Sequence, residues 1–219
     1  MITKTLRARL PVVCALAGAA SLTLAGCAGS QKPPAIISTP KPTSPYKGTV
    51  LDSGFSKPTA TFTSTGHKKF AIAKDTRGKA TLVYFGYTHC PDVCPTTMAD
   101  LGQAVKSLPK AEQKKVRVLF VTSDPHRDTP KRMRAWLNSF DRDFIGLTAS
   151  WSTISTTAKS LGVGLTKPVV RDGDYQVTHG AQVLAYPVGS DTGRVLYTQN
   201  ATTADYKHDI PLLVKGVKP

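Results

Sequence analysis

The segment TLVYFGYTHCPDVCP, residues 81–95, carries two cysteines where a buried strand turns into a helix. Residues 81–85 form an apolar run of strand length, rich in β-branched and aromatic side chains, as buried strands are. Residues 96–108 place apolar side chains at helical spacing, and Pro95 fits the first helical position. A helix N-terminus offers its dipole and free backbone N–H groups, so we expect the cysteines here to favour the thiolate form. Thiolate is the form that attacks a disulfide or binds a soft metal.

Strand and helix patterns alternate on both sides of this segment. The other predicted strands are residues 59–62, 69–72, 116–121, 144–147, 183–186 and 194–198, with an opening hairpin turning at Gly66. The other predicted helices are residues 130–140, 152–161 and 204–214. This order predicts one α/β domain, residues 49–219, in which helices flank both faces of a mixed sheet.

The first 26 residues have the order of a secretory signal. A positive start, with Lys4, Arg7 and Arg9, precedes an uncharged apolar run that ends in small residues. The ending Leu24-Ala-Gly-Cys27 resembles a bacterial lipobox, which implies cleavage before Cys27 and attachment of lipid to that cysteine. The alternative is an uncleaved N-terminal anchor. In both cases the rest of the chain lies outside the cytoplasmic membrane and is tethered to it.

Residues 27–48 are predicted to be a semi-extended linker, because prolines alternate there with Ser, Thr and Lys. The 219-residue chain has a formal net charge of +15, which raises nucleic acid or an anionic membrane as partners. Export and the lack of a basic block argue against nucleic acid. The surplus charge favours anionic lipid or an acidic surface on a partner, or it simply keeps the surface solvated.

The two cysteines of the segment have the spacing C-x3-C, one residue longer than the C-x-x-C of thioredoxin-type enzymes. This loop permits a Cys90–Cys94 disulfide and also lets both sulfurs face one ion. A purely structural bridge across so small a ring would stabilise the domain little, so we interpret the pair as functional. A metal site needs a third ligand, and the sequence alone does not select one among the five histidines, His67, His89, His126, His179 and His208.

Three motifs in order resemble one family. They are GYTHCPDVCP at residues 86–95, SDPHRDTP at residues 123–130, and Tyr175-x-x-x-His179 before a strand. Together they resemble the Sco/SenC family of copper-binding proteins, which have a thioredoxin-like fold, and the resemblance covers residues 55–215.

The resemblance implies a copper site and places its ligands. Cys90, Cys94 and His179 would bind copper as Cu(I) or Cu(II), and Asp124 would lie in the nearby loop that shapes the site. The family commonly has Asp before the late histidine and Ser after it, where this chain has Thr178 and Gly180. A carboxylate that could orient the imidazole is therefore missing at that position.

The function that the resemblance implies is that of a copper chaperone, and not an enzyme. With the lipobox-like ending at Cys27, we expect it to be lipid-anchored on the extracytoplasmic face of the cell membrane. Family members help to assemble the binuclear copper centre of cytochrome c oxidase subunit II; they deliver copper, reduce the cysteines of that centre, or do both. Subunit II and other extracytoplasmic copper carriers are thus the expected partners. The alternative is a thiol-disulfide oxidoreductase that keeps the oxidase cysteines reduced. Peroxide reduction is a weaker third candidate function, because nothing in the sequence marks a lone peroxidatic thiol.

For several residues near the motifs, the sequence allows two interpretations. Asp92 is either a weak extra copper ligand or a negative charge that repels the thiolates, and zinc also suits these ligand types. Met98 falls on the apolar helix stripe, which favours a core position over a thioether ligand. His126 is either a transient copper contact or, as we expect, a solvent-exposed side chain.

The second motif has its own structural expectations. Asp128 or Thr129 is expected to cap the helix that follows. Arg127 is expected to pair with Asp124.

Overall fold

The computed structural model describes residues 44–171 and 174–219, which belong to one compact unit, residues 42–219. The predicted signal peptide, the predicted lipidation site Cys27 and most of the predicted linker lie outside the described residues. Among the residues described, no helix has both the length and the apolarity needed to cross a bilayer.

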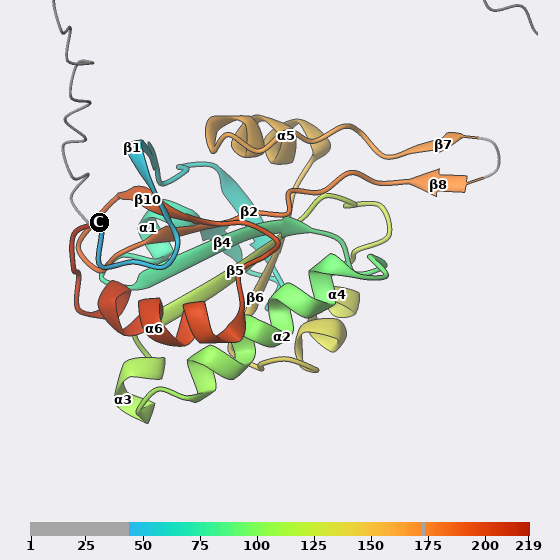
Figure 1. Cartoon of the computed structure of the whole chain (residues 1–219). Helices are drawn as coiled ribbons and strands as arrows, with labels where there is room; N and C mark the ends of the chain where they lie inside the picture. The colour runs from blue at the N-terminus through green and yellow to red at the C-terminus, as the bar shows by residue number, and fades with distance from the viewer. Residues whose placement is uncertain (1–43, 172–173) are drawn as a thin grey trace, which may run out of the picture. The chain divides into compact units, whose positions relative to one another are not determined.

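An eight-stranded mixed sheet forms the centre of the unit, in the order β1-β10-β9-β4-β5-β6-β2-β3 (Figure 1). Its strands are β1 (Thr49–Ser56), β2 (Thr61–Ser64), β3 (Lys69–Ala71), β4 (Ala80–Gly86), β5 (Val116–Thr122), β6 (Ile145–Thr148), β9 (Val183–Tyr186) and β10 (Thr192–Tyr197). The pairs β4–β5 and β5–β6 are parallel, and the other pairs are antiparallel. The carboxyl ends of β4 and β5 therefore meet at one edge of the sheet.

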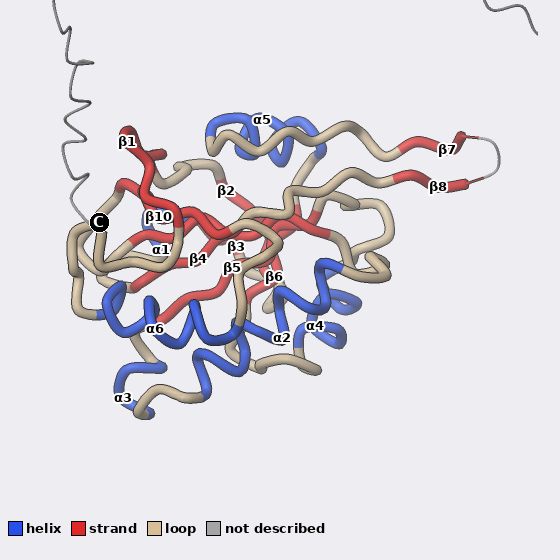
Figure 2. The backbone as a smooth tube through the Cα atoms, viewed as in Figure 1, coloured by secondary structure: helices blue, strands red, loops and turns tan. Residues whose placement is uncertain are grey.

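Helices cover both faces of the sheet (Figures 1 and 2). One face is covered by α2 (Val93–Lys106), α4 (Pro130–Leu137) and α6 (Thr203–Val214), and the other by α1 (Ile72–Asp75) and α5 (Trp151–Ser160). The short α3 (Lys110–Gln113) lies in the connection from α2 to β5. A separate hairpin of β7 (Val169–Arg171) and β8 (Asp174–Gln176) extends away from the main sheet.

Successive side chains of β4 point to opposite faces of the sheet, so this strand contributes to the hydrophobic core on each face. Leu82 and Tyr84 pack into the core under α2, α4 and α6, whereas Val83 and Phe85 pack into the core under α5. The strand is buried along its whole length, which explains its continuous apolar sequence. The predicted mixed sheet with flanking helices and an opening hairpin, β2–β3, is confirmed.

The short helices α1 and α3 and the β7–β8 hairpin were not predicted, and two further differences lie in the main sheet and beside the cysteines. Strand β1 was not predicted; it pairs with β10, and its register is irregular between Val50 and Phe55. Helix α2 begins at Val93, before the predicted start at Pro95. Proline is tolerated at that point because the N–H groups of a first helical turn have no intrahelical partner.

The end of the predicted linker packs on the domain. Tyr46 is 6% exposed, and its hydroxyl donates a hydrogen bond to the carbonyl oxygen of Val217 at 2.6 Å. The backbone N–H groups of Lys47 and Gly48 donate to the buried carboxylate of Asp209 at 2.9 Å. Ordered packing thus begins a few residues before residue 49.

Candidate metal centre

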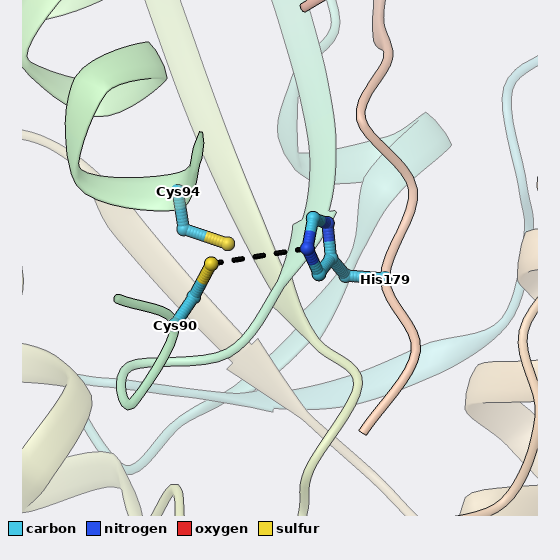
Figure 3. Close-up of side chains that lie close together, drawn as sticks. All are labelled: Cys90, Cys94 and His179. Carbon is cyan, nitrogen blue, oxygen red and sulfur yellow. Dashed lines mark hydrogen bonds between the residues drawn. The ribbon is translucent and has the colours of Figure 1, made fainter. Parts of the chain in front are cut away.

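The two cysteines follow the carboxyl end of β4: Cys90 lies on the loop that leads into α2, and Cys94 lies in the first turn of α2. Cys90 is 7% exposed and Cys94 is fully buried. The imidazole of His179 faces them from the segment between β8 and β9 (Figure 3). The ligand atoms of the three residues all lie within 4.8 Å of one another, and Cys90 Sγ is 3.8 Å from His179 Nε2. The structure therefore brings together the three residues that the family resemblance implies.

The donor set suits a thiophilic ion. Two sulfurs and one imidazole nitrogen match Cu(I), and the same trigonal set occurs in sites that hold Cu(II). The ring of His179 also contacts the ring of Tyr87, with centroids 5.6 Å apart. His179 Nε2 faces Cys90, while Nδ1 is turned toward the carbonyl oxygen of Gly180 at 3.5 Å. The ring nitrogen directed at the sulfurs is therefore free of other recorded contacts among the described residues.

Two glycines allow the chain to pass close to the site. A Cβ at Gly86 would lie 2.8 Å from Cys94 Sγ and 2.6 Å from Cε1 of Tyr84. A Cβ at Gly180 would lie 2.6 Å from Cγ1 of Val163. Real Cβ atoms do not approach so closely, so glycine is needed both behind the sulfur and directly after the histidine.

Burial dominates the ionisation of Cys94. Desolvation raises the pKa of its thiol to about 12, although hydrogen bonds from the Tyr84 hydroxyl and from the backbone act in the opposite direction. The expectation that the helix N-terminus makes this thiol acidic is therefore wrong for the metal-free protein. A metal ion bound here must displace the proton, which couples binding to pH.

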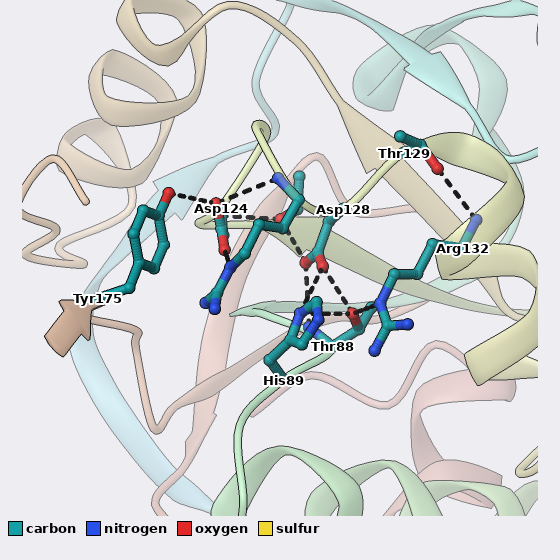
Figure 4. A network of polar contacts seen from close by, with 9 residues as sticks. Thr88, His89, Asp124, Asp128, Thr129, Arg132 and Tyr175 are labelled. Atoms are coloured by element: carbon teal, nitrogen blue, oxygen red, sulfur yellow. Dashed lines mark hydrogen bonds and ion pairs between the residues drawn. The ribbon is translucent and has the colours of Figure 1, made fainter. Parts of the chain in front are cut away.

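A buried carboxylate holds the cysteine loop in place (Figure 4). Asp128 accepts hydrogen bonds from the Thr88 N–H at 3.0 Å, from the Thr88 hydroxyl at 2.6 Å and from the Thr122 hydroxyl at 2.8 Å. Arg132 Nε donates to the Thr88 hydroxyl at 2.9 Å. Asp128 thus joins the loop before α2 to the loop after β5. Of the two expected capping residues, Thr129 caps α4, and Asp128 has this linking role instead.

Asp124 connects the same region to the segment that carries His179. It is fully buried, pairs with Arg127 as expected, and accepts a hydrogen bond from the Tyr175 hydroxyl at 2.9 Å (Figure 4). The carboxylate itself is not among the clustered ligand atoms. Asp92 is exposed and is also outside the cluster.

The remaining candidates lie elsewhere. Met98 is fully buried in the core, as expected from its place on the helix stripe. The other four histidines are exposed, and none belongs to the cluster: His67, His89, His126 and His208. Thr178, at the position where a carboxylate would be expected, accepts a hydrogen bond from the Thr166 N–H at 2.7 Å, and the hydrogen bonds of the imidazole among the described residues go to Cys90 and Gly180.

Sequence reasoning missed Tyr84. Its hydroxyl donates a hydrogen bond to Cys94 Sγ at 3.3 Å, from a side chain that is fully buried. The strand's alternation could have placed Tyr84 on the face that α2 covers, but the contact itself depends on the path of the loop.

A thioredoxin-like sheet with two cysteines after a central strand and a histidine beside them defines a class of metal-binding or redox domain. Comparison with known proteins identifies the family within this class. The family model described as SCO1/SenC matches residues 54–210. The chain belongs to the SCO1/SenC family.

Individual relatives agree with the family match. The chain is 33% identical over 150 residues to the mitochondrial SCO1 homolog 1 of Arabidopsis thaliana, covering 68% of this chain and 42% of the relative. The chain spans about half the length of the curated relatives it matches.

Solved structures share the fold. The structure of Bradyrhizobium japonicum ScoI with copper bound is 30% identical, covers 73% of this chain and 97% of that chain, and has a TM-score of 0.61. The apo Sco1 protein from Thermus thermophilus is 31% identical, covers 77% and 96% of the two chains, and has a TM-score of 0.66.

Proposed function

We propose that this protein binds one copper ion through Cys90, Cys94 and His179 and acts as a copper chaperone. The convergence of two sulfurs and an imidazole nitrogen within 4.8 Å is the observation that carries the proposal. A copper-bound relative of the same fold, 30% identical to this chain, supports it. The ligand chemistry favours Cu(I), with Cu(II) held by the same set.

The position of each ligand suits transfer of the ion. Cys94 is the buried end of the site, Cys90 lies closer to solvent, and His179 is half-buried in a segment without regular structure. An acceptor therefore approaches from the side of Cys90 and His179, and replaces the imidazole before the inner sulfur.

The proposed acceptor is the binuclear copper centre of cytochrome c oxidase subunit II. The Sco family is described as one of cytochrome c oxidase assembly proteins, and membership of the family supports this destination. Other extracytoplasmic copper carriers are the proposed donors. The surplus of positive charge fits partners with acidic surfaces.

The proposed location is the extracytoplasmic face of the cell membrane. A signal sequence ending at residue 26 and a lipid on Cys27 would anchor the chain, and the proline-rich residues that follow would act as a spacer. Retention in the membrane fraction, lost when Cys27 is replaced by Ala, tests the anchor.

A second candidate function is thiol-disulfide exchange on the cysteines of the same oxidase centre. It is favoured by the closeness of the two free thiols, whose sulfurs share the 4.8 Å cluster. His179 separates the two functions, because a dithiol exchange does not require an imidazole, whereas a three-coordinate copper site does.

Anaerobic copper titration of the purified protein, reduced and oxidised, distinguishes these functions. We expect one copper per reduced protein and none per oxidised protein. Rapid disulfide exchange without copper uptake would reject the chaperone and favour the oxidoreductase.

A further inference from the structure

Tyr84 stands directly behind the inner sulfur of the metal centre. The side chain projects from the middle of the sheet toward α2 and is fully buried. Its hydroxyl donates a hydrogen bond to Cys94 Sγ at 3.3 Å and accepts one from the side chain of Thr97 on α2. A buried hydroxyl normally has an acceptor for its proton, and here the acceptor is a proposed copper ligand.

The backbone is shaped to allow this contact. Gly86, two positions along the same strand, leaves open the space where a Cβ would meet both the Tyr84 ring and Cys94 Sγ. Phe120 on β5 lies against the ring, with centroids 6.1 Å apart, and limits its movement. Gly86 therefore permits the contact between the hydroxyl and the sulfur, and Phe120 restrains the ring on its other side.

A hydrogen bond to a ligand sulfur changes the electron density that the sulfur gives to the metal. Hydrogen bonding around a cysteine ligand is one of the means by which proteins tune copper potentials. Cu(I) takes less density from sulfur than Cu(II), so the donor stabilises the Cu(I) form more.

We propose that Tyr84 is a positioning residue that donates a hydrogen bond to the Cys94 thiolate and thereby favours Cu(I) over Cu(II) at the centre. This inference rests on the proposed copper site. The same bond stabilises Cys94 as the leaving group when a Cys90–Cys94 disulfide is reduced. In that step an external thiolate bonds to Cys90 Sγ, the disulfide bond breaks, and its electron pair goes to Cys94 Sγ.

The test compares Tyr84→Phe with Tyr186→Phe in the full-length protein. Both tyrosines are fully buried in the same sheet, but among the described residues the Tyr186 hydroxyl has no hydrogen-bond partner. Phenylalanine keeps the ring and its packing in both variants, and only Tyr84→Phe removes a hydroxyl that donates to sulfur. The Tyr186 variant also lies on the opposite face of the sheet, away from the cysteines.

In Tyr84→Phe we expect the ratio of Cu(I) to Cu(II) affinity to fall about tenfold, because one charge-assisted hydrogen bond is lost. For a one-electron couple this corresponds to a midpoint potential about 59 mV lower. The sulfur-to-Cu(II) absorption should move to longer wavelength, since the thiolate becomes a better donor. Tyr186→Phe should match the wild type in both measurements.

A copper-independent measurement keeps the two proposals separate. The oxidised, metal-free protein is reduced with dithiothreitol, and we expect Tyr84→Phe to react about tenfold more slowly than Tyr186→Phe. If the wild type binds no copper, the proposed function fails and this rate decides the role of Tyr84. A potential, an absorption band and a reduction rate that all equal those of Tyr186→Phe would overturn the inference.

If Tyr84→Phe does not fold, the wild type itself provides the test. The copper–sulfur vibrations in its resonance Raman spectrum should shift when the protein is exchanged into D2O, and Gly86→Ala should reduce that shift by separating the ring from the sulfur, leaving the part due to the backbone N–H of Tyr87. An absence of any shift in the wild type would overturn the inference.

Discussion

The cysteine half and the histidine half of the centre are built differently. Cys90 lies on a short connection between a fully buried strand and a helix, Cys94 lies in the first turn of that helix, and Asp128 fixes the connection through Thr88. His179 lies in a segment of no regular structure, where its own recorded polar contacts are with Cys90 and Gly180. A well-fixed pair of sulfurs beside a less constrained imidazole suits the proposed binding and transfer of an ion.

Removal of an inner ligand should have the largest effect. We expect Cys94→Ser to abolish detectable Cu(I) binding, because a buried hydroxyl cannot replace a thiolate as a soft ligand. A competition assay with a chromogenic Cu(I) chelator measures this. The serine still accepts the Tyr84 hydrogen bond, so the circular dichroism spectrum should remain native. Tight Cu(I) binding by a folded Cys94→Ser protein would show that the cysteine half is not the site.

Removal of the imidazole should be selective. In His179→Ala we expect loss of tight Cu(II) binding and of the sulfur-to-copper absorption, while the Cys90–Cys94 disulfide still forms. Stability should change by no more than about 0.5 kcal/mol, because the side chain is half-buried and makes few contacts. The matched control is His126→Ala, which removes an exposed imidazole from the neighbouring loop. Unchanged copper spectra in His179→Ala would remove this residue from the site.

Loss of the buried carboxylate should loosen the cysteine loop. Asp128→Ala leaves the N–H and hydroxyl of Thr88 and the hydroxyl of Thr122 without their acceptor, and we expect a cost of about 3 kcal/mol in unfolding free energy. Urea denaturation measures it. Thr129→Ala removes the neighbouring N-cap and should cost about 1 kcal/mol. Equal costs for the two variants would contradict the linking role of Asp128.

The buried thiol should make stability depend on alkaline pH. Burial raises the pKa of Cys94 from 9.0 to about 12, so its contribution to folding is complete below pH 9.0 and is lost as pH rises toward 12. The unfolding free energy of the reduced, metal-free protein should therefore fall faster above pH 9.0 than that of Cys94→Ser. Burial of Tyr46 acts in the same direction in both proteins, and the comparison cancels it. Parallel pH profiles would show that Cys94 ionises normally.

The smallest effect should come from Asp92. Its side chain is exposed and lies outside the cluster, so we expect Asp92→Asn to change copper affinity less than about threefold. The same chelator competition measures it. A tenfold loss would make this carboxylate a ligand in the loaded protein.

The sequence predicted the sheet and the flanking helices because their patterns are local. The continuous apolar run of β4 and the helical stripe containing Met98 identify themselves without tertiary information. Strand β1 could not be predicted, since its polar, glycine-containing sequence forms a strand only through pairing with β10.

In the site, as in the fold, local sequence predicts some features and others depend on tertiary structure. Spacing alone identified the cysteine pair, but the choice of His179 among five histidines came from the family resemblance, because ligands far apart in sequence meet only in the fold. The role of Asp128 and the contact of Tyr84 with Cys94 depend on loop paths that no residue pattern encodes. The raised pKa of the Cys94 thiol was not predicted either, because desolvation by burial outweighs the effect expected of the helix N-terminus.

X-ray absorption spectroscopy of the copper-loaded protein tests the central claim most directly. We predict a first shell of two sulfur atoms and at least one nitrogen, with the outer-shell scattering typical of imidazole, and loss of that imidazole signal in His179→Ala. A shell without sulfur, or an imidazole signal that persists in His179→Ala, would contradict the proposed two-cysteine, one-histidine centre.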